Sequence, residues 1–346
     1  MLLTGTLERL RFEGRSLADN ALGDPVLREL LVYLPPSYRR DDTRRYPLLV
    51  VLTGYASTHA SLLNFKPWEP NFLERYERLI AQGCAEAIVV LPDCFTRLGG
   101  SQFLDSSGTG RYQSYIADDV LGLVDAQYRT LPQREARAIV GKSSGGFGAL
   151  RMGMDRPERF GVLGSHAGDC AFELSVRPRF VEVAPVYERH GGAEGFLSAL
   201  AERMPDPTPN GQREFHALEI LAMASVYAPG SSPGFGELPF DPYTAELVPS
   251  TWARWLQHDP CVRLEQQPKS LCQARFVFLD AGKRDEYGLQ FGARILAQRL
   301  NNSGVTLHHE EFDGGHMGTS HRYDVSLPKL LAAVEGHSSV GMRGRL

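Results

Sequence analysis

A serine between two glycines is the first feature of this chain that could do chemistry. The segment GKSSGG (141–146) matches the pattern G-x-S-x-G and directly follows the apolar run ARAIV (136–140). In proteins that use this pattern, a tight turn from strand to helix lifts the serine hydroxyl above the end of a sheet, where it can attack a carbonyl carbon. The pattern predicts Ser143 as a nucleophile, and the alternative is an ordinary serine at a helix N-cap.

Two other segments resemble functional motifs but lack a residue or an element that the motif requires. The segment GSSPG (230–234) also fits G-x-S-x-G, but no strand precedes it, and Pro233 after its serine has no N–H to offer an oxyanion. The segment AIVGKSS (138–144) resembles a phosphate-binding loop, but that motif needs a glycine where Ala136 stands. Neither segment competes with Ser143.

An attacking serine needs a histidine to take its proton and a carboxylate to orient that histidine. With this strand, serine and helix pattern, the acid and then the histidine follow the serine along the chain, each on a loop after a strand. His316 follows the apolar run 305–312 and two glycines, whereas His321 falls at the start of the last predicted helix, where we expect a surface role. We therefore predict His316 as the base.

Three carboxylates could orient this histidine, because Asp280, Asp285 and Glu286 all lie at or after the end of the predicted strand 274–280. Asp280 ends the strand and is suited to holding the turn, whereas Asp285 lies further out on the loop. We favour Asp285 as the acid and keep Glu286 and Asp280 as alternatives.

No metal or cofactor is predicted. The run His308 to Glu311 offers two histidines and two glutamates, but neighbouring side chains of a strand point to opposite faces and cannot all converge on one ion. The five cysteines are scattered and form no C-x-x-C pair, so neither a zinc ribbon nor a disulfide framework is indicated, and we expect reduced thiols.

Apolar runs that alternate with helical patterns must position these residues. Strands are predicted at 30–36, 46–52, 86–92, 136–141, 160–166, 274–280 and 305–312. Helices are predicted at 70–83, 115–129, 145–154, 286–300 and 325–337. This alternation predicts an α/β fold with a mainly parallel sheet covered by helices on both faces.

One stretch breaks the alternation. Residues 171–270 contain helical pieces without a strand rhythm, so we predict a core of 1–170 and 271–337, a largely helical lid or pocket insertion at 171–270, and a flexible tail at 338–346. Three aromatic-bearing segments are candidates for lining a pocket, although ordinary packing explains them equally well: 65–68, 93–110, and the region of Trp252 and Trp255.

Composition excludes several classes of partner. The 346 residues carry a formal net charge of -4, which offers no electrostatic footprint for nucleic acid. No apolar run is long enough to span a membrane, and the first residues lack the features of a signal peptide, so we expect a cytoplasmic protein. A homo-oligomer is compatible with the sequence.

Five segments together resemble the esterase family of α/β-hydrolases that includes S-formylglutathione hydrolase (esterase D), mycolyltransferases and feruloyl esterases. They are 32–55, 115–150, 156–169, 279–288 and 312–318. The resemblance implies an α/β-hydrolase fold in which Ser143 is the nucleophile, Asp285 the acid and His316 the base. It also implies that the backbone N–H groups of Tyr55 and Ser144 bind the oxyanion.

The chain departs from the usual pattern of that family in two places. Thr53-Gly54 replaces the common His-Gly, and Ser144 replaces a frequent methionine. Because the oxyanion contacts come from the backbone, these changes affect the pocket rather than the mechanism.

The resemblance implies a serine hydrolase that cleaves a small-molecule ester or thioester through an acyl-enzyme. One alternative is an acyltransferase, in which an alcohol intercepts the same acyl-enzyme. A second alternative is a hydrolase-fold protein that binds a ligand without catalysis.

Overall fold

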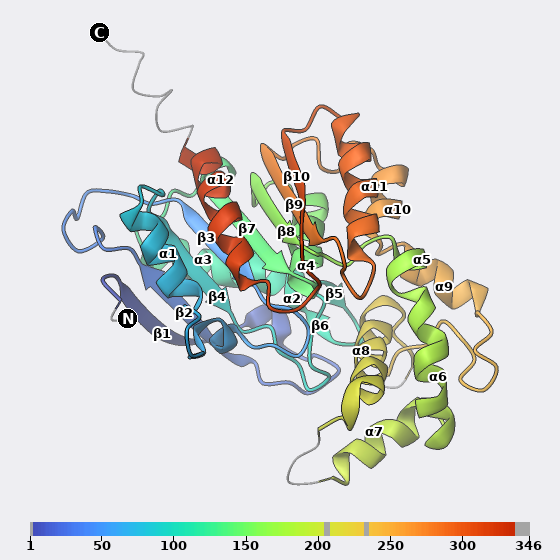
Figure 1. The fold of residues 1–346 in the computed structure, drawn as a ribbon. Helices are drawn as coiled ribbons and strands as arrows, with labels where there is room; N and C mark the ends of the chain where they lie inside the picture. The colour runs from blue at the N-terminus through green and yellow to red at the C-terminus, as the bar shows by residue number, and fades with distance from the viewer. Residues whose placement is uncertain (1–2, 204–207, 232–234, 336–346) are drawn as a thin grey trace.

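The computed structural model describes residues 3–203, 208–231 and 235–335, and its centre is an eight-stranded sheet (Figure 1). The strands in spatial order are β1 (Thr6–Glu13), β2 (Leu27–Leu34), β4 (Ile88–Pro92), β3 (Leu48–Leu52), β7 (Arg137–Lys142), β8 (Val162–His166), β9 (Phe276–Gly282) and β10 (Leu307–Phe312). Strands β4 to β10 pair in parallel, whereas β2 is antiparallel to both of its neighbours. The mainly parallel sheet confirms the predicted α/β class.

Strand β1 is one element that the hydrophobic pattern does not predict. It lies at the edge of the sheet, where its residues alternate between exposed and partly buried positions. Charged residues such as Glu8 and Arg11 interrupt its apolar ones, and such charges protect an edge strand from pairing with other chains.

Helices cover both faces of the sheet because its buried strands are apolar on both sides. Leu49 and Val51 of β3 pack with α1 (Phe72–Ala81) and α12 (Tyr323–Glu335), which lie together on one face (Figure 1). The alternate residues of β3 belong to the cluster on the opposite face, which also contains residues of α3 (Leu121–Gln127), α4 (Ser144–Asp155) and α11 (Leu289–Asn301). The predicted helix 115–129 begins with a π-helical turn, Tyr115–Val120, and continues as α3.

The chain between β8 and β9 forms a group of helices with a hydrophobic core of its own (Figure 1). These helices are α5 (Phe172–Ser175), α6 (Phe180–Arg189), α7 (Ala193–Ala201), α8 (Gly211–Tyr227) and α9 (Pro249–Leu256). The next helix, α10 (Pro260–Gln266), packs on α11, and its buried Cys261 and Leu264 belong to the core of the sheet. Aromatic side chains dominate this core, among them Phe180, Trp252 and Trp255. Phe147 of α4 belongs to the same cluster, so the helical group is packed onto the helix that follows Ser143.

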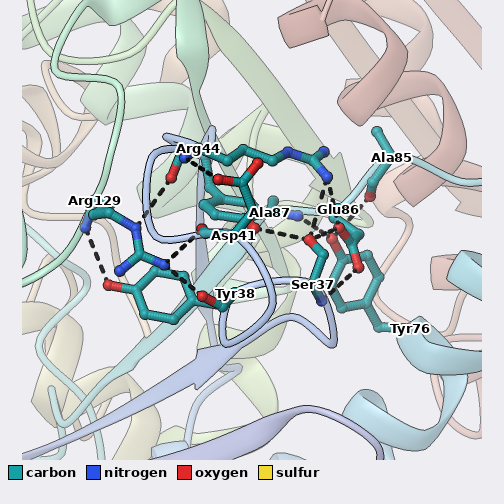
Figure 2. Close-up of polar contacts among 10 residues, drawn as sticks. Ser37, Tyr38, Asp41, Arg44, Tyr76, Ala85, Glu86, Ala87 and Arg129 are labelled. Carbon is teal, nitrogen blue, oxygen red and sulfur yellow. Dashed lines mark hydrogen bonds and ion pairs between the residues drawn. The ribbon is translucent and has the colours of Figure 1, made fainter.

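A polar network fixes the connection between β2 and β3 (Figure 2). The backbone N–H of Ser37 donates to Glu86 at 3.1 Å, and Arg44 donates to the same carboxylate at 3.0 Å. Arg129 donates to the backbone oxygen of Arg44 at 3.1 Å. These contacts lie where β3 and β4 begin. They therefore stabilise the amino ends of these strands, at the opposite end of the sheet from Ser143.

Among the described residues, no helix is long and apolar enough to cross a membrane. The predicted tail 338–346 lies outside the described residues.

Candidate active site

Ser143 stands on a sharp turn between β7 and α4. Its backbone has φ 57° and ψ -125°. Residues with a side chain rarely adopt this conformation, which is typical of a nucleophile on a strand-to-helix turn. A Cβ atom on Gly141 would lie 2.4 Å from the backbone of Gly145, and a Cβ atom on Gly145 would lie 2.5 Å from the carbonyl oxygen of Leu52. Both glycines of the motif are therefore required by steric exclusion.

His316 is oriented by a buried carboxylate. Its Nδ1 lies 2.8 Å from Oδ2 of Asp285, whose side chain is 0% exposed. The other oxygen, Oδ1, accepts a hydrogen bond from the backbone N–H of Tyr287 at 3.0 Å. An ionised carboxylate only accepts hydrogen bonds, so Nδ1 of His316 carries the proton and Nε2 is left as an acceptor.

Glu286, the first alternative acid, contacts the same histidine at a different atom. Its carboxylate accepts the backbone N–H of His316 at 2.6 Å. A Cβ atom on Gly315 would lie 2.4 Å from this carboxylate, so a side chain at position 315 would displace Glu286 from His316. Glu286 therefore holds the loop, and Asp285 holds the ring.

Asp280, the second alternative acid, belongs to a separate chain of hydrogen bonds. Its Oδ1 lies 2.7 Å from Nδ1 of His166, and Nε2 of His166 lies 2.9 Å from Oγ of Ser326. Arg322 donates to Oδ2 of Asp280 at 2.9 Å. This second Ser-His-Asp arrangement is fully buried, with Ser326 0% exposed, so it ties α12 to β8 and β9 and has no room for a substrate.

Ser143 and His316 line one cavity of about 190 Å³. The cavity is lined by Gly54, Tyr55, Ser57, Lys142, Ser143, Asp169, Ser175, Val176, Arg179, Phe215, Glu219, Tyr287, Leu289, His316 and Met317. The structure records no hydrogen bond between the side chains of Ser143 and His316; in ligand-free enzymes such bonds are often long and tighten when substrate binds.

The two predicted oxyanion donors flank Ser143. Ser144 is the first residue of α4, so its N–H has no partner within the helix and lies at the positive end of the helix dipole. Tyr55 lines the cavity on a turn that is held by a hydrogen bond from Oγ1 of Thr53 to the backbone oxygen of Ser57 at 3.0 Å. Thr53 thus stabilises the turn of Tyr55 through its side chain.

Burial shifts the pKa of two ionisable groups in the cavity wall. It lowers the pKa of Lys142, and the charge of Asp285 opposes this shift. It raises the pKa of Asp169 to about 7, and the charge of Glu219 adds to the increase. Glu219 itself forms an ion pair with Arg179.

Several residues of the cavity wall were not among the predicted site residues, notably Asp169, Arg179, Phe215 and Glu219. Arg179, Phe215 and Glu219 come from the helical group between β8 and β9, where the sequence pattern carries little information. Asp169 did carry a signal, because it is a carboxylate just beyond the carboxyl end of a parallel strand, where ligands bind in open α/β sheets.

The aromatic residues suggested as pocket lining lie elsewhere. Phe65 and Trp68 are 88% and 101% exposed, and neither lines the cavity. Trp252 and Trp255 lie in the core of the helical group, where their large rings fill space between α6 and α9. None of the residues 93–110 lines the cavity.

Within the described residues, no group of three or more histidine, cysteine, aspartate or glutamate side chains could hold a metal ion. The second G-x-S-x-G segment, 230–234, has three residues, 232–234, outside the described part of the chain.

A family model described as "Putative esterase" matches residues 25–333 of this chain. No protein with curated annotation matches it by sequence.

Solved structures with a similar fold include esterases and related hydrolases. A ferulic acid esterase superposes with a TM-score of 0.59 at 18% identity, covering 96% of this chain and 100% of the other. An S-formylglutathione hydrolase from Agrobacterium tumefaciens has a TM-score of 0.57 at 18% identity, with coverages of 97% and 96%. A fluorophosphonate-binding serine hydrolase from Staphylococcus aureus has a TM-score of 0.54 at 15% identity, with coverages of 95% and 98%. The fold is that of the α/β-hydrolases.

Proposed function

The chain belongs to the Esterase family and is a carboxylic ester hydrolase, and from this premise we propose that it works as a serine esterase through Ser143, His316 and Asp285. The observation that carries this proposal is the arrangement of His316. Its ring is held by a buried carboxylate at one nitrogen and lines the cavity of Ser143, so the other nitrogen is available to a serine proton.

In the proposed first step, Oγ of Ser143 attacks the carbonyl carbon of the ester while Nε2 of His316 takes the hydroxyl proton. The N–H groups of Tyr55 and Ser144 stabilise the negative charge that forms on the carbonyl oxygen. The tetrahedral intermediate then collapses, the ester C–O bond breaks, and the leaving alcohol receives the proton from His316.

In the second step, water attacks the acyl group on Ser143 and gives its proton to His316. The carbon to Oγ bond breaks, the carboxylic acid leaves, and Ser143 regains its proton. Asp285 keeps its negative charge throughout and stabilises the imidazolium form of His316.

Replacement of Ser143 tests this proposal. We expect Ser143→Ala to lower kcat for a chromogenic ester by about four to six orders of magnitude while the protein stays folded, because only the attacking oxygen is lost. A fluorophosphonate should label the native enzyme once, on Ser143, and should not label the variant, as read by mass spectrometry of peptides. Ser165→Ala is the matched control. Ser165 lies on the neighbouring strand β8 but does not line the cavity, so its replacement should leave labelling of Ser143 intact. Near-normal turnover by Ser143→Ala would refute the assignment.

Hydrolysis and acyl transfer proceed through the same acyl-enzyme. Analysis of the reaction products distinguishes the two activities. We expect the free carboxylic acid to remain the main product when an acceptor alcohol is added at millimolar concentration. If a new ester becomes the main product, the protein is an acyltransferase. If neither a product nor a labelled serine is found, the protein is a ligand-binding member of the fold.

A further inference from the structure

Asp169 is a buried carboxylate at the cavity with almost no partner. It lies in the loop between β8 and α5, is 7% exposed and lines the cavity of Ser143. In the described part of the chain, its carboxylate accepts one hydrogen bond, from the hydroxyl of Ser144 at 3.4 Å, and forms no ion pair. A bond of that length is weak, so most of the capacity of this carboxylate is unused.

Other buried carboxylates of the molecule are better compensated. Glu219, on the wall of the same cavity, pairs with Arg179. Asp285 has His316, and Asp280 has both His166 and Arg322. Asp169 therefore differs from these carboxylates, although the charges of His316 and Arg179 oppose the rise in its pKa.

This arrangement costs stability in the ligand-free protein. Burial raises the pKa of Asp169 to about 7, and the neighbouring charge of Glu219 contributes to that increase. A buried carboxylate with one weak hydrogen bond and no ion pair destabilises the folded state, and groups that break the rules of packing in this way cluster at functional sites. A ligand that donates to Asp169 would remove the cost.

We propose that Asp169 determines substrate specificity, and that the preferred ester carries a hydrogen-bond donor, a hydroxyl or an ammonium group, within a few bonds of its carbonyl carbon. The donor must be near the carbonyl because Asp169 contacts Ser144, whose backbone N–H is the proposed oxyanion donor. This inference rests on the proposed function, since it assigns the substrate of the same cavity.

The rest of the cavity wall favours a compact substrate. Tyr55 and Phe215 pack edge to face with ring centroids 5.4 Å apart, and both line the cavity. Arg179 and Glu219 neutralise each other, so Asp169 is the acceptor left for a neutral or cationic donor. A volume of about 190 Å³ is below the usual range for larger ligands, which is about 300 to 1,000 Å³.

A matched series of esters tests the inference. Ethyl butanoate, ethyl 3-hydroxypropanoate and ethyl 3-aminopropanoate differ only in a methyl, hydroxyl or ammonium group at one position of the acyl chain. Propyl acetate and 2-hydroxyethyl acetate make the same comparison on the alcohol side. We expect kcat/KM to be at least about tenfold higher for a donor-bearing ester than for its methyl counterpart, because the methyl group leaves the carboxylate unpaired.

The variants of Asp169 give the decisive comparison. In Asp169→Leu, which removes the acceptor, the ratio of donor to methyl ester should fall to about one. Asp169→Asn, which keeps one acceptor oxygen, should give an intermediate ratio and serves if the leucine variant does not fold. Asp118→Asn is the control, because it removes a carboxylate that pairs with arginines at the surface, and it should keep the native ratio. A higher rate for the ammonium ester than for the hydroxyl ester would identify the donor as a cation.

Two outcomes would overturn the inference while leaving the proposed function intact. One is an equal kcat/KM across the series in the native enzyme, and the other is an unchanged ratio in Asp169→Leu. Fluorophosphonate labelling of Ser143, measured on the same samples, reports the nucleophile independently of these ratios. Labelling without hydrolysis of any of the five esters would also overturn the inference, whereas absence of both labelling and hydrolysis would refute the proposed function.

Discussion

Asp285 and Glu286 are neighbours in sequence, yet they hold different parts of His316. Asp285 contacts the ring at Nδ1, and Glu286 contacts the backbone N–H. We expect Asp285→Asn to lower kcat about 10⁴-fold, because an amide no longer holds the ring in the required tautomer. Glu286→Gln should cost much less, because an amide oxygen can still accept the backbone N–H. Steady-state kinetics of both variants measure the difference.

The combination of two changes gives a further check on the same prediction. Adding His316→Ala to Asp285→Asn should lower kcat little beyond the effect of His316→Ala alone, because residues that act as a unit are not additive. If the two losses multiply, or if Glu286→Gln is the more damaging change, Asp285 is not the acid.

Asp169 makes a prediction about stability as a function of pH. Its pKa rises from 3.8 in the unfolded chain to about 7 in the folded protein, so the folded state binds the extra proton between these values. The contribution of Asp169 to stability is therefore largest below about pH 4 and is lost as the pH rises towards 7. Asp169→Asn removes this loss, so the stability of the variant relative to the native protein should increase from pH 5 to pH 8. Urea unfolding at the two pH values measures it, and a relative stability that does not change with pH would contradict the prediction.

Among the elements, α10 begins with an N-cap residue, Asp259, that also accepts hydrogen bonds from outside this helix. Asp259 accepts the N–H of Cys261 at 2.8 Å within α10. It also accepts the N–H groups of Ala171 at 2.9 Å and Phe172 at 2.7 Å, next to the loop of Asp169. One carboxylate thus joins the beginning of the helical group to its end.

Removal of this cap should destabilise the protein. We expect Asp259→Ala to lower the free energy of unfolding by about 2–4 kcal/mol, because buried backbone N–H groups lose a charged acceptor. Asp241→Ala is the control; Asp241 accepts the N–H groups of Tyr243 and Thr244 in an exposed turn, and its loss should cost much less. Urea unfolding compares the two, and equal losses would contradict the linking role of Asp259.

For the molecule as a whole, two of the tryptophans report on the helical group. Trp252 and Trp255 are 3% and 0% exposed in its core, whereas Trp68 is exposed. The core includes Phe147 of α4, so the helical group and the sheet share buried contacts. We expect the urea midpoints from tryptophan fluorescence and from far-UV circular dichroism to coincide. An earlier fluorescence transition would mean that the helical group unfolds by itself. Trp68→Phe is the control, and its fluorescence transition should have the native midpoint.

Local patterns in the sequence determined much of this fold. The seven predicted strands all belong to the sheet. A buried parallel strand such as β3 or β4 is visible in the sequence, because it is apolar on both faces over several consecutive residues. The G-x-S-x-G motif marks the turn of Ser143, because the sterics of Gly141 and Gly145 act within a few residues. Strand β1 escaped prediction because its charged edge residues hide the alternation.

Tertiary structure alone decided how distant charges are paired. The sequence favoured Asp285 but kept Asp280 and Glu286 as alternatives, because all three lie at or after the end of the same predicted strand. Only the folded arrangement shows that Asp280 faces His166 and that Asp285 faces His316. The isolation of Asp169 likewise depends on residues that are far apart in the chain. Electrostatic interaction and burial depend on distance in space, whereas sequence patterns report periodicity along the chain.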